Sequence, residues 1–141
     1  MTATGTVPIL VMGLGCRQGC SVAQLLSLIE SSLAQAGIAL SAVSGLASID
    51  LKRQEPSLLQ LAAQLNLGFE VFNAEQLAPY ASQLSHRSNI AFEHTGCFGV
   101  AESAALALAE QLAGAPATLR ITRQKSPGAT FALASFEQNP R

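Results

Sequence analysis

The chain has 141 residues, of which 49% are apolar and 12% charged, and its formal net charge at pH 7 is −1. This length predicts one domain over residues 1–141, with a core that needs no disulfides. The cations are scattered and form no basic stripe, which excludes a dedicated nucleic-acid binder. No apolar run reaches the length of about 18 residues that a membrane span needs. Three cysteines, an odd number, favour a reducing, cytoplasmic compartment.

The first third of the chain predicts a buried strand followed by an amphipathic helix. Residues 7–13 form a continuous apolar run, which is typical of a strand buried on both faces. A glycine-rich loop is expected at residues 14–20. Ser21 then has the side chain of a helix N-cap, and Gly37 is expected to end that helix.

The middle of the chain predicts a second strand, a second helix and a third strand. The second strand is expected within residues 38–48. Pro56 suits the first turn of a helix, and Gly68 is expected to end it. Residues 69–72 alternate as a short strand does, and Asn73 is expected to cap a short helix.

The last third predicts an alanine-rich helix and a hairpin. Residues 100–114 carry a stripe of small and apolar side chains that permits close packing on a sheet: Ala101, Ala104, Ala105, Leu108 and Leu112. Residues 117–123 and 129–136 alternate, and a Lys-Ser-Pro-Gly turn joins them. The elements together predict an α/β fold, a three-layer α/β/α domain with a mixed, mostly parallel sheet and a C-terminal β-hairpin.

The loop after the first predicted strand has the features of an anion-binding site. Gly13, Gly15 and Gly19 allow close approach to backbone amides, and Cys16 and Arg17 lie between them. The following helix adds unpaired N–H groups, and the guanidinium of Arg17 can pair with a carboxylate or a phosphate. The spacing GxGxxxG differs from the dinucleotide fingerprint, and a simple glycine-rich turn is the alternative.

A second candidate site precedes the alanine-rich helix. Thr95 and Gly96 place a hydroxyl and a flexible backbone just before this helix, which begins at Val100. Glu102 follows in the first turn as a candidate acid or base. Its alternative role is to favour the helix dipole.

A third candidate site follows the second predicted strand. Ser48 and Asp50 leave the strand end, and Lys52 and Glu55 come next. Asp50 could act as a general base, or it could cap a turn through its own backbone.

The cysteines and histidines allow two further chemistries. Cys16, Cys20, Cys97 and His94 have the residue types of a zinc site, but no second CxxC pair exists. Cys16 or Cys97 with His86 or His94 could form a nucleophile–base pair. Free thiols in glycine-rich loops are the simpler interpretation, and we expect neither a metal nor a cofactor.

Three motifs in order resemble one known family. GLGCRQG at 13–19, LASIDLKRQEPSLLQLA at 46–62 and TGCFGVAESAAL at 95–106 look like the C-terminal domain family of the cobalamin-biosynthesis proteins CobE and CbiG. The likeness covers nearly the whole chain. Because the chain carries no further N-terminal region of the CbiG kind, it is similar to the stand-alone CobE-like members.

This resemblance implies a role in making the corrin ring of vitamin B12, in the oxygen-dependent branch. CbiG proteins are associated with opening a precorrin lactone and releasing a two-carbon fragment, and CobE-like proteins with binding or handing on an intermediate. The positions matching the family motifs are Gly13, Gly15, Arg17, Gly19, Asp50, Lys52, Glu55, Thr95, Gly96, Val100 and Glu102. Cys97 and Phe98 depart from the small or hydroxyl residues expected there, which disfavours hydrolase chemistry through those positions.

The residues and the resemblance converge on a ligand with many carboxylates. Two helix N-termini with Arg17 suit the rim of a precorrin or a corrinoid such as hydrogenobyrinic acid, and a small-residue surface could supply an apolar floor. The favoured hypothesis is a carrier, with other cobalamin-biosynthesis enzymes as possible partners. A precorrin hydrolase using Asp50 and Glu102 is the first alternative, and a small nucleotide-binding domain is the second.

Overall fold

The computed structural model of the chain describes residues 9–16, 19–84 and 99–136. Its strands form one sheet in the order β3-β2-β1-β5-β4. They are β1 (Ile9–Cys16), β2 (Gly45–Ile49), β3 (Gly68–Phe72), β4 (Thr118–Ser126) and β5 (Ala129–Phe136). The first three strands are parallel, and β5 is antiparallel to both β1 and β4. All strands except β5 therefore run in one direction, which confirms the predicted mixed sheet and C-terminal hairpin.

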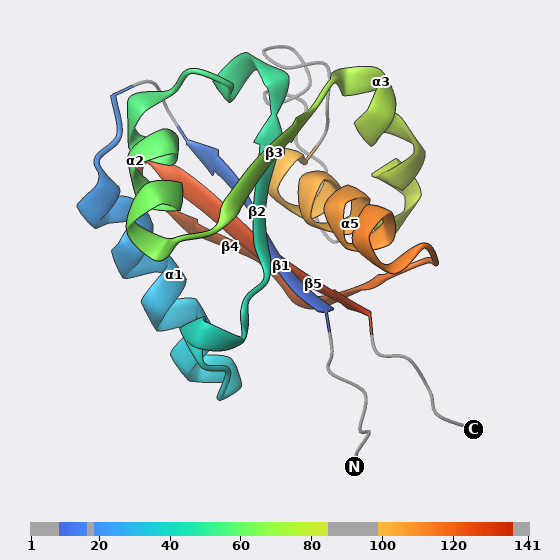
Figure 1. Cartoon of the computed structure of the whole chain (residues 1–141), viewed down its shortest axis with the longest axis horizontal. Helices are drawn as coiled ribbons and strands as arrows, with labels where there is room; N and C mark the ends of the chain where they lie inside the picture. The colour runs from blue at the N-terminus through green and yellow to red at the C-terminus, as the bar shows by residue number, and fades with distance from the viewer. Residues whose placement is uncertain (1–8, 17–18, 85–98, 137–141) are drawn as a thin grey trace.

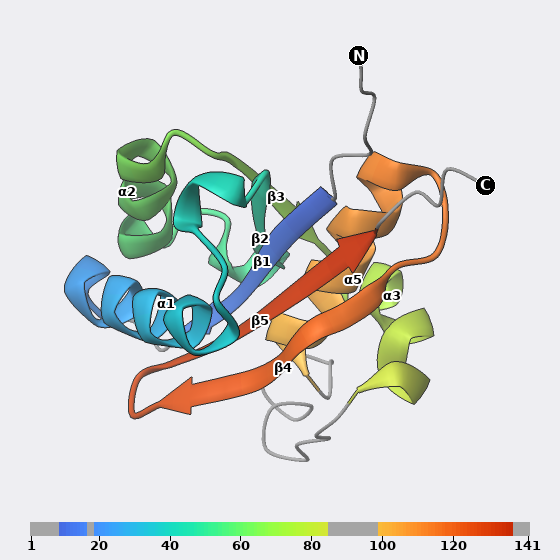
Figure 2. The same cartoon turned by 90° about the horizontal axis from the view of Figure 1, so that it is seen from below.

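Helices cover both faces of this sheet (Figures 1 and 2). On one face lie α1 (Val22–Ala36) and α2 (Pro56–Leu65), and on the other lie α5 (Val100–Ala113) and the short α3 (Ala74–Leu77). The described segments also contain three short 3₁₀ helices: η1 (Leu40–Ala42), η2 (Asp50–Lys52) and η3 (Ala78–Gln83). Two clusters of buried apolar side chains fill the space on the two sides of the sheet. The predicted three-layer α/β/α architecture is confirmed.

Short-range chemistry sets the ends of the helices. The side chains of Ser21 and Asn73 each accept a hydrogen bond from the backbone N–H three residues further on, as expected of N-caps. Gly37 ends α1 in the left-handed conformation, with φ of 70°. The end of α2 differs from the prediction: Asn66 adopts the left-handed conformation, and Gly68 begins β3 instead.

The first strand is longer than the sequence predicts. It continues through Cys16 because β5 pairs with it along its whole length. Gly13 and Gly15 therefore lie in the strand, and the prediction that the glycine-rich loop begins at residue 14 was wrong. A Cβ on Gly13 would clash with the backbone of α5. This glycine allows α5 to pack closely on the sheet.

The alanine-rich helix is buried over most of its length. Every residue from Ala101 to Ala109 is buried. The alanines of α5 therefore line the core, and the expected small-residue surface does not exist on this helix. Leu112, predicted on the buried stripe, lies beyond this run and is 49% exposed.

Candidate functional site

Several of the candidate residues meet at the edge of the sheet where the parallel strands end. Chain direction places η2 and the start of α2 directly after β2. The side chain of Val100, the first residue of α5, lies 3.8 Å from where a Cβ of Gly15 would be, so α5 begins over the end of β1. We call this region, made of Cys16, Asp50, Lys52, Glu55 and Val100, the carboxyl edge (top of Figure 1). In open α/β sheets ligands bind at this edge.

The thiol of Cys16 at the carboxyl edge is poorly suited to nucleophilic chemistry. Burial and a hydrogen bond with Cys20 raise the pKa of Cys16 to about 12, although the nearby Lys52 acts in the opposite direction. The sulfur of Cys20 lies 3.6 Å from the hydroxyl oxygen of Ser57. Since the thiolate is the reactive form, Cys16 is protonated and unreactive at neutral pH.

The charged groups at the carboxyl edge are only loosely paired. The ammonium of Lys52 lies 3.8 Å from a carboxylate oxygen of Glu55, and both side chains are largely covered. The carboxylate of Asp50 is half-exposed and has no hydrogen bond or ion pair within the described segments. Neither α2 nor α5 has a side-chain cap at its N-terminus. The first residue of α2 is Pro56, which has no N–H, and the N–H of Leu58 donates to the carbonyl oxygen of Glu55, so this helix end offers an anion the N–H of Ser57 and the positive end of the helix dipole.

The two carboxylates expected to be catalytic have different surroundings. Asp50 is half-exposed, whereas the side chain of Glu102 is buried, with 1% of its surface exposed. The Oε2 atom of Glu102 accepts a hydrogen bond of 2.8 Å from the backbone N–H of Arg123. Arg123 lies where the β4–β5 register shifts, so Glu102 ties the start of α5 to an irregular part of β4. This contact gives Glu102 a structural role.

Ser48 is likewise a structural residue in β2. Its side chain is fully buried, and its hydroxyl donates a hydrogen bond of 2.6 Å to the carbonyl oxygen of Leu14 in β1. This bond joins the ends of two neighbouring parallel strands. Ser48 therefore fixes the strand ends from which Cys16 and Asp50 emerge.

The remaining candidates divide between an exposed turn and segments outside the description. Gly19 has φ of 84°, which favours glycine, and no described atom beyond its chain neighbours lies within 4 Å of where its Cβ would be. Four candidates, and both histidines, lie outside the described residues. The four candidates are Arg17, Thr95, Gly96 and Cys97. In the part of the chain that the structure describes, no three His, Cys, Asp or Glu side chains gather as a metal ion would require.

Sequence reasoning missed two residues at the same edge. Lys125 pairs with Thr130, and Thr130 in turn pairs with Gly15. Because β4 runs in the direction of β1, its end brings an exposed lysine to the carboxyl edge. The hairpin itself was predicted, but the pairing of β5 with β1 carries no local signal.

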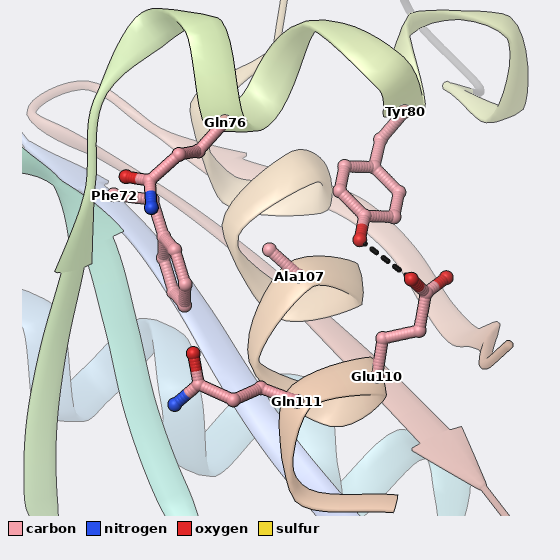
Figure 3. Close-up of a pocket in the computed structure, with 6 residues that line it drawn as sticks. All are labelled: Phe72, Gln76, Tyr80, Ala107, Glu110 and Gln111. Carbon is pink, nitrogen blue, oxygen red and sulfur yellow. Dashed lines mark hydrogen bonds between the residues drawn. The ribbon is translucent and has the colours of Figure 1, made fainter. Parts of the chain in front are cut away.

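A separate pocket of about 320 Å³ lies between α5 and the α3–η3 segment, away from these residues (Figure 3). Its lining consists of Phe72, Gln76, Tyr80, Ala107, Glu110 and Gln111. The Tyr80 hydroxyl donates a hydrogen bond of 2.8 Å to Glu110. Burial first, and then this carboxylate, raise the pKa of Tyr80 to about 12. No sequence motif indicated this pocket.

None of the helices in the described segments combines the length and the apolar character needed to cross a membrane.

The model of the family described as "Cobalamin synthesis G C-terminus" matches residues 10–134. The chain is 38% identical to Protein CobE of Sinorhizobium sp. over 89% of its own length and 79% of that protein.

Two further comparisons extend this similarity. A cobalt-precorrin-5A hydrolase of Priestia megaterium is 31% identical over 89% of the chain, which spans about a third of that longer protein (32%). The crystal structure of CobE, described as a protein from the cobalamin (vitamin B12) biosynthetic pathway, superposes with a TM-score of 0.91 at 39% identity. That superposition covers 97% of both chains.

Proposed function

We propose that the chain binds a precorrin or corrinoid intermediate at the carboxyl edge. The chain belongs to the cobalamin synthesis G C-terminus family, whose members take part in cobalamin biosynthesis. It acts as a carrier or accessory protein of the oxygen-dependent branch, and other enzymes of cobalamin biosynthesis are its partners. Residues 1–141 work as one unit in this proposal. The free thiols of Cys16 and Cys20 support a reducing, cytoplasmic setting.

The observation that carries this proposal is the gathering of anion-binding groups at one edge. Lys52 and Lys125 supply positive charge there, beside the carboxylates of Asp50 and Glu55, and the N-termini of α2 and α5 add the positive ends of two helix dipoles. A precorrin carries acetate and propionate carboxylates around its rim. Several weak, separated anion sites suit such a ligand better than one deep pocket would. Arg17, which matches the first family motif, is expected to add a further cation.

An exposed apolar side chain stands among these polar groups. Leu51 lies between Asp50 and Lys52 in η2 and is 64% exposed. Single exposed leucines are ordinary on protein surfaces, so the relevance of Leu51 comes from its place between Asp50 and Lys52. We assign Leu51 the contact with the apolar face of the macrocycle, in place of the expected small-residue floor.

A carrier role is favoured over hydrolysis by the lack of a nucleophile–base pair among the described residues. Cys16 is protonated at neutral pH, and Glu102 is held by the backbone of β4. Hydrolysis remains the second candidate, because a relative is a cobalt-precorrin-5A hydrolase and the carboxylate of Asp50 is free to act as a base.

The binding proposal is tested by titrating the protein with hydrogenobyrinic acid and following the visible absorbance. We expect saturable binding that weakens about tenfold in Lys52→Gln, which corresponds to the loss of about 1.4 kcal/mol from one charge-assisted contact. Arg120→Gln removes the same charge from an exposed site in the middle of β4 and should leave the affinity unchanged. Absence of binding at about 100 μM ligand, or equal weakening by both substitutions, would contradict the proposal.

The hydrolase alternative is tested separately. The protein is incubated with cobalt-precorrin-5A, and the product is analysed by mass spectrometry. The loss of a general base typically lowers the rate by a factor of about 10² to 10⁴. Turnover by the unchanged protein that falls at least about 100-fold in Asp50→Asn would therefore favour hydrolysis over the carrier role. Binding without turnover would favour the carrier.

A further inference from the structure

The pocket between α5 and the α3–η3 segment is lined by both aromatic and polar side chains. Figure 3 shows the Phe72 ring with the Gln76 and Gln111 amides on one side of Ala107, and the Tyr80–Glu110 pair on the other. The methyl group of Ala107 leaves space between the two sides, because a larger residue at this buried helix position would fill it.

The hydrogen-bonding capacity of this pocket is only partly used. One carboxylate oxygen of Glu110 accepts from Tyr80, and no described residue donates to the other. The Gln111 amide makes no hydrogen bond within the described segments, whereas the Gln76 oxygen accepts from the N–H of Asn73. The lining therefore offers a carboxylate oxygen and an amide oxygen as acceptors.

The charge of the lining determines the kind of group that can enter. Among the described residues that line the pocket, Glu110 is the only charged one, and none is a lysine or an arginine. An anion would be repelled and would meet no cation. A cation would meet the carboxylate of Glu110 and two aromatic side chains, Phe72 and Tyr80.

We propose that this pocket binds an arginine side chain presented by a partner protein. A flat guanidinium can lie against the part of the Phe72 and Tyr80 side chains that lines the pocket, and its fork of five N–H donors can reach Glu110 and Gln111 together. An ammonium, which is compact and strongly hydrated, uses this geometry less well.

Two surface features indicate that the cation arrives on a larger molecule. Gln76 and Gln111 at the pocket margin are exposed, so the site is shallow and does not enclose a small ligand. Leu112, the residue after Gln111, is a large apolar side chain that is 49% exposed. It adds an exposed apolar side chain to the same end of α5, and protein interfaces combine such apolar groups with polar ones. The pocket shares no residue with the carboxyl edge, so this inference does not depend on corrinoid binding.

The test uses the intrinsic fluorescence of Tyr80, the single tyrosine of a chain that has no tryptophan. The full chain is titrated with N-acetyl-arginine amide and, in parallel, with N-acetyl-citrulline amide, which has nearly the same shape without the charge. We expect saturable binding of the arginine compound in the millimolar range, at least about tenfold tighter than the citrulline compound.

Matched variants separate recognition by the pocket from general charge. Glu110→Gln keeps an oxygen for the Tyr80 hydroxyl and should weaken arginine binding about tenfold. Glu75→Gln removes the same charge from α3, outside the pocket lining, and should leave binding unchanged. Circular dichroism of both variants confirms that they fold.

Four results would overturn the proposal. Equal binding of the arginine and citrulline compounds would show that the pocket does not recognise a cation. Equal loss in the two glutamate variants, or no saturation by the arginine compound at about 100 mM, would exclude a specific site. Binding of free agmatine at least tenfold tighter than N-acetyl-arginine amide would indicate a small-molecule site instead of a partner's side chain.

Discussion

Replacing Gly13 by alanine should strongly destabilise the fold. A Cβ at this position would overlap the carbonyl oxygen of Ala101 and would lie 2.8 Å from the backbone nitrogen of Ala105. Ordinary contact begins at 3.4 Å, so α5 would have to move away from β1 by more than half an ångström. Both atoms belong to the helix backbone, which cannot rotate aside as a side chain can.

The size of the effect follows from the packing that such a movement disturbs. Every residue from Ala101 to Ala109 is buried, so a shift of α5 loosens contacts along most of the helix. We expect a loss of about 3 kcal/mol in the free energy of unfolding, the upper part of the range for overpacked cores. For a chain of this length, that corresponds to a fall in Tm of about 10 °C.

Two other glycines provide graded controls for a urea denaturation followed by circular dichroism. A Cβ on Gly15 would lie 2.7 Å from the side-chain oxygen of Thr130, which can rotate, so Gly15→Ala should lose only about 1 kcal/mol. Nothing lies within 4 Å of a Cβ on Gly68, so Gly68→Ala should change stability by no more than about 0.5 kcal/mol. If Gly13→Ala were as stable as Gly68→Ala, the close packing of α5 on β1 would be refuted.

Three further predictions concern buried or paired polar groups. Glu102→Ala should lose about 2 kcal/mol because the N–H of Arg123 loses its acceptor, and Glu102→Gln should lose less; equal losses in urea denaturation would contradict this. Ser48→Ala should lose about 1 kcal/mol by the same measurement, and an unchanged midpoint would count against its buried hydrogen bond. The Tyr80 phenol should titrate near pH 12 by ultraviolet absorbance, and Glu110→Gln should lower its pKa. Because the pKa of Tyr80 is raised in the folded state, the contribution of Tyr80 to stability is complete below pH 10 and is lost as the pH rises from 10 to about 12. A wild-type midpoint near pH 10 would contradict the pairing.

The sequence predicted those parts of the fold that depend on neighbouring residues. Ser21 and Asn73 were identified as N-caps because their side chains bond to backbone only three residues away. Gly37 was identified because a left-handed helix end favours glycine. The continuation of β1 through Cys16 was not predicted, since glycines such as Gly15 are common in loops and the pairing of this segment with β5 depends on distant residues.

In the candidate sites too, the sequence predicted the contacts between residues close in the chain and missed those between distant residues. The proximity of Asp50, Lys52 and Glu55 followed from their closeness in sequence at the end of a parallel strand. Lys125 reaches that edge only through the pairing of β5 with β1, which short-range patterns do not specify. The Tyr80–Glu110 contact joins residues thirty positions apart, and no periodicity indicates it.

The most direct test of the proposed function is an amide chemical-shift map of the labelled protein with hydrogenobyrinic acid. We predict shifts concentrated at residues 50–53 of the carboxyl edge and at the start of α5, while residues 74–80 beside the separate pocket stay unchanged. Shifts concentrated elsewhere in the chain, or none at a ligand concentration of about 1 mM, would contradict a corrinoid site at this edge.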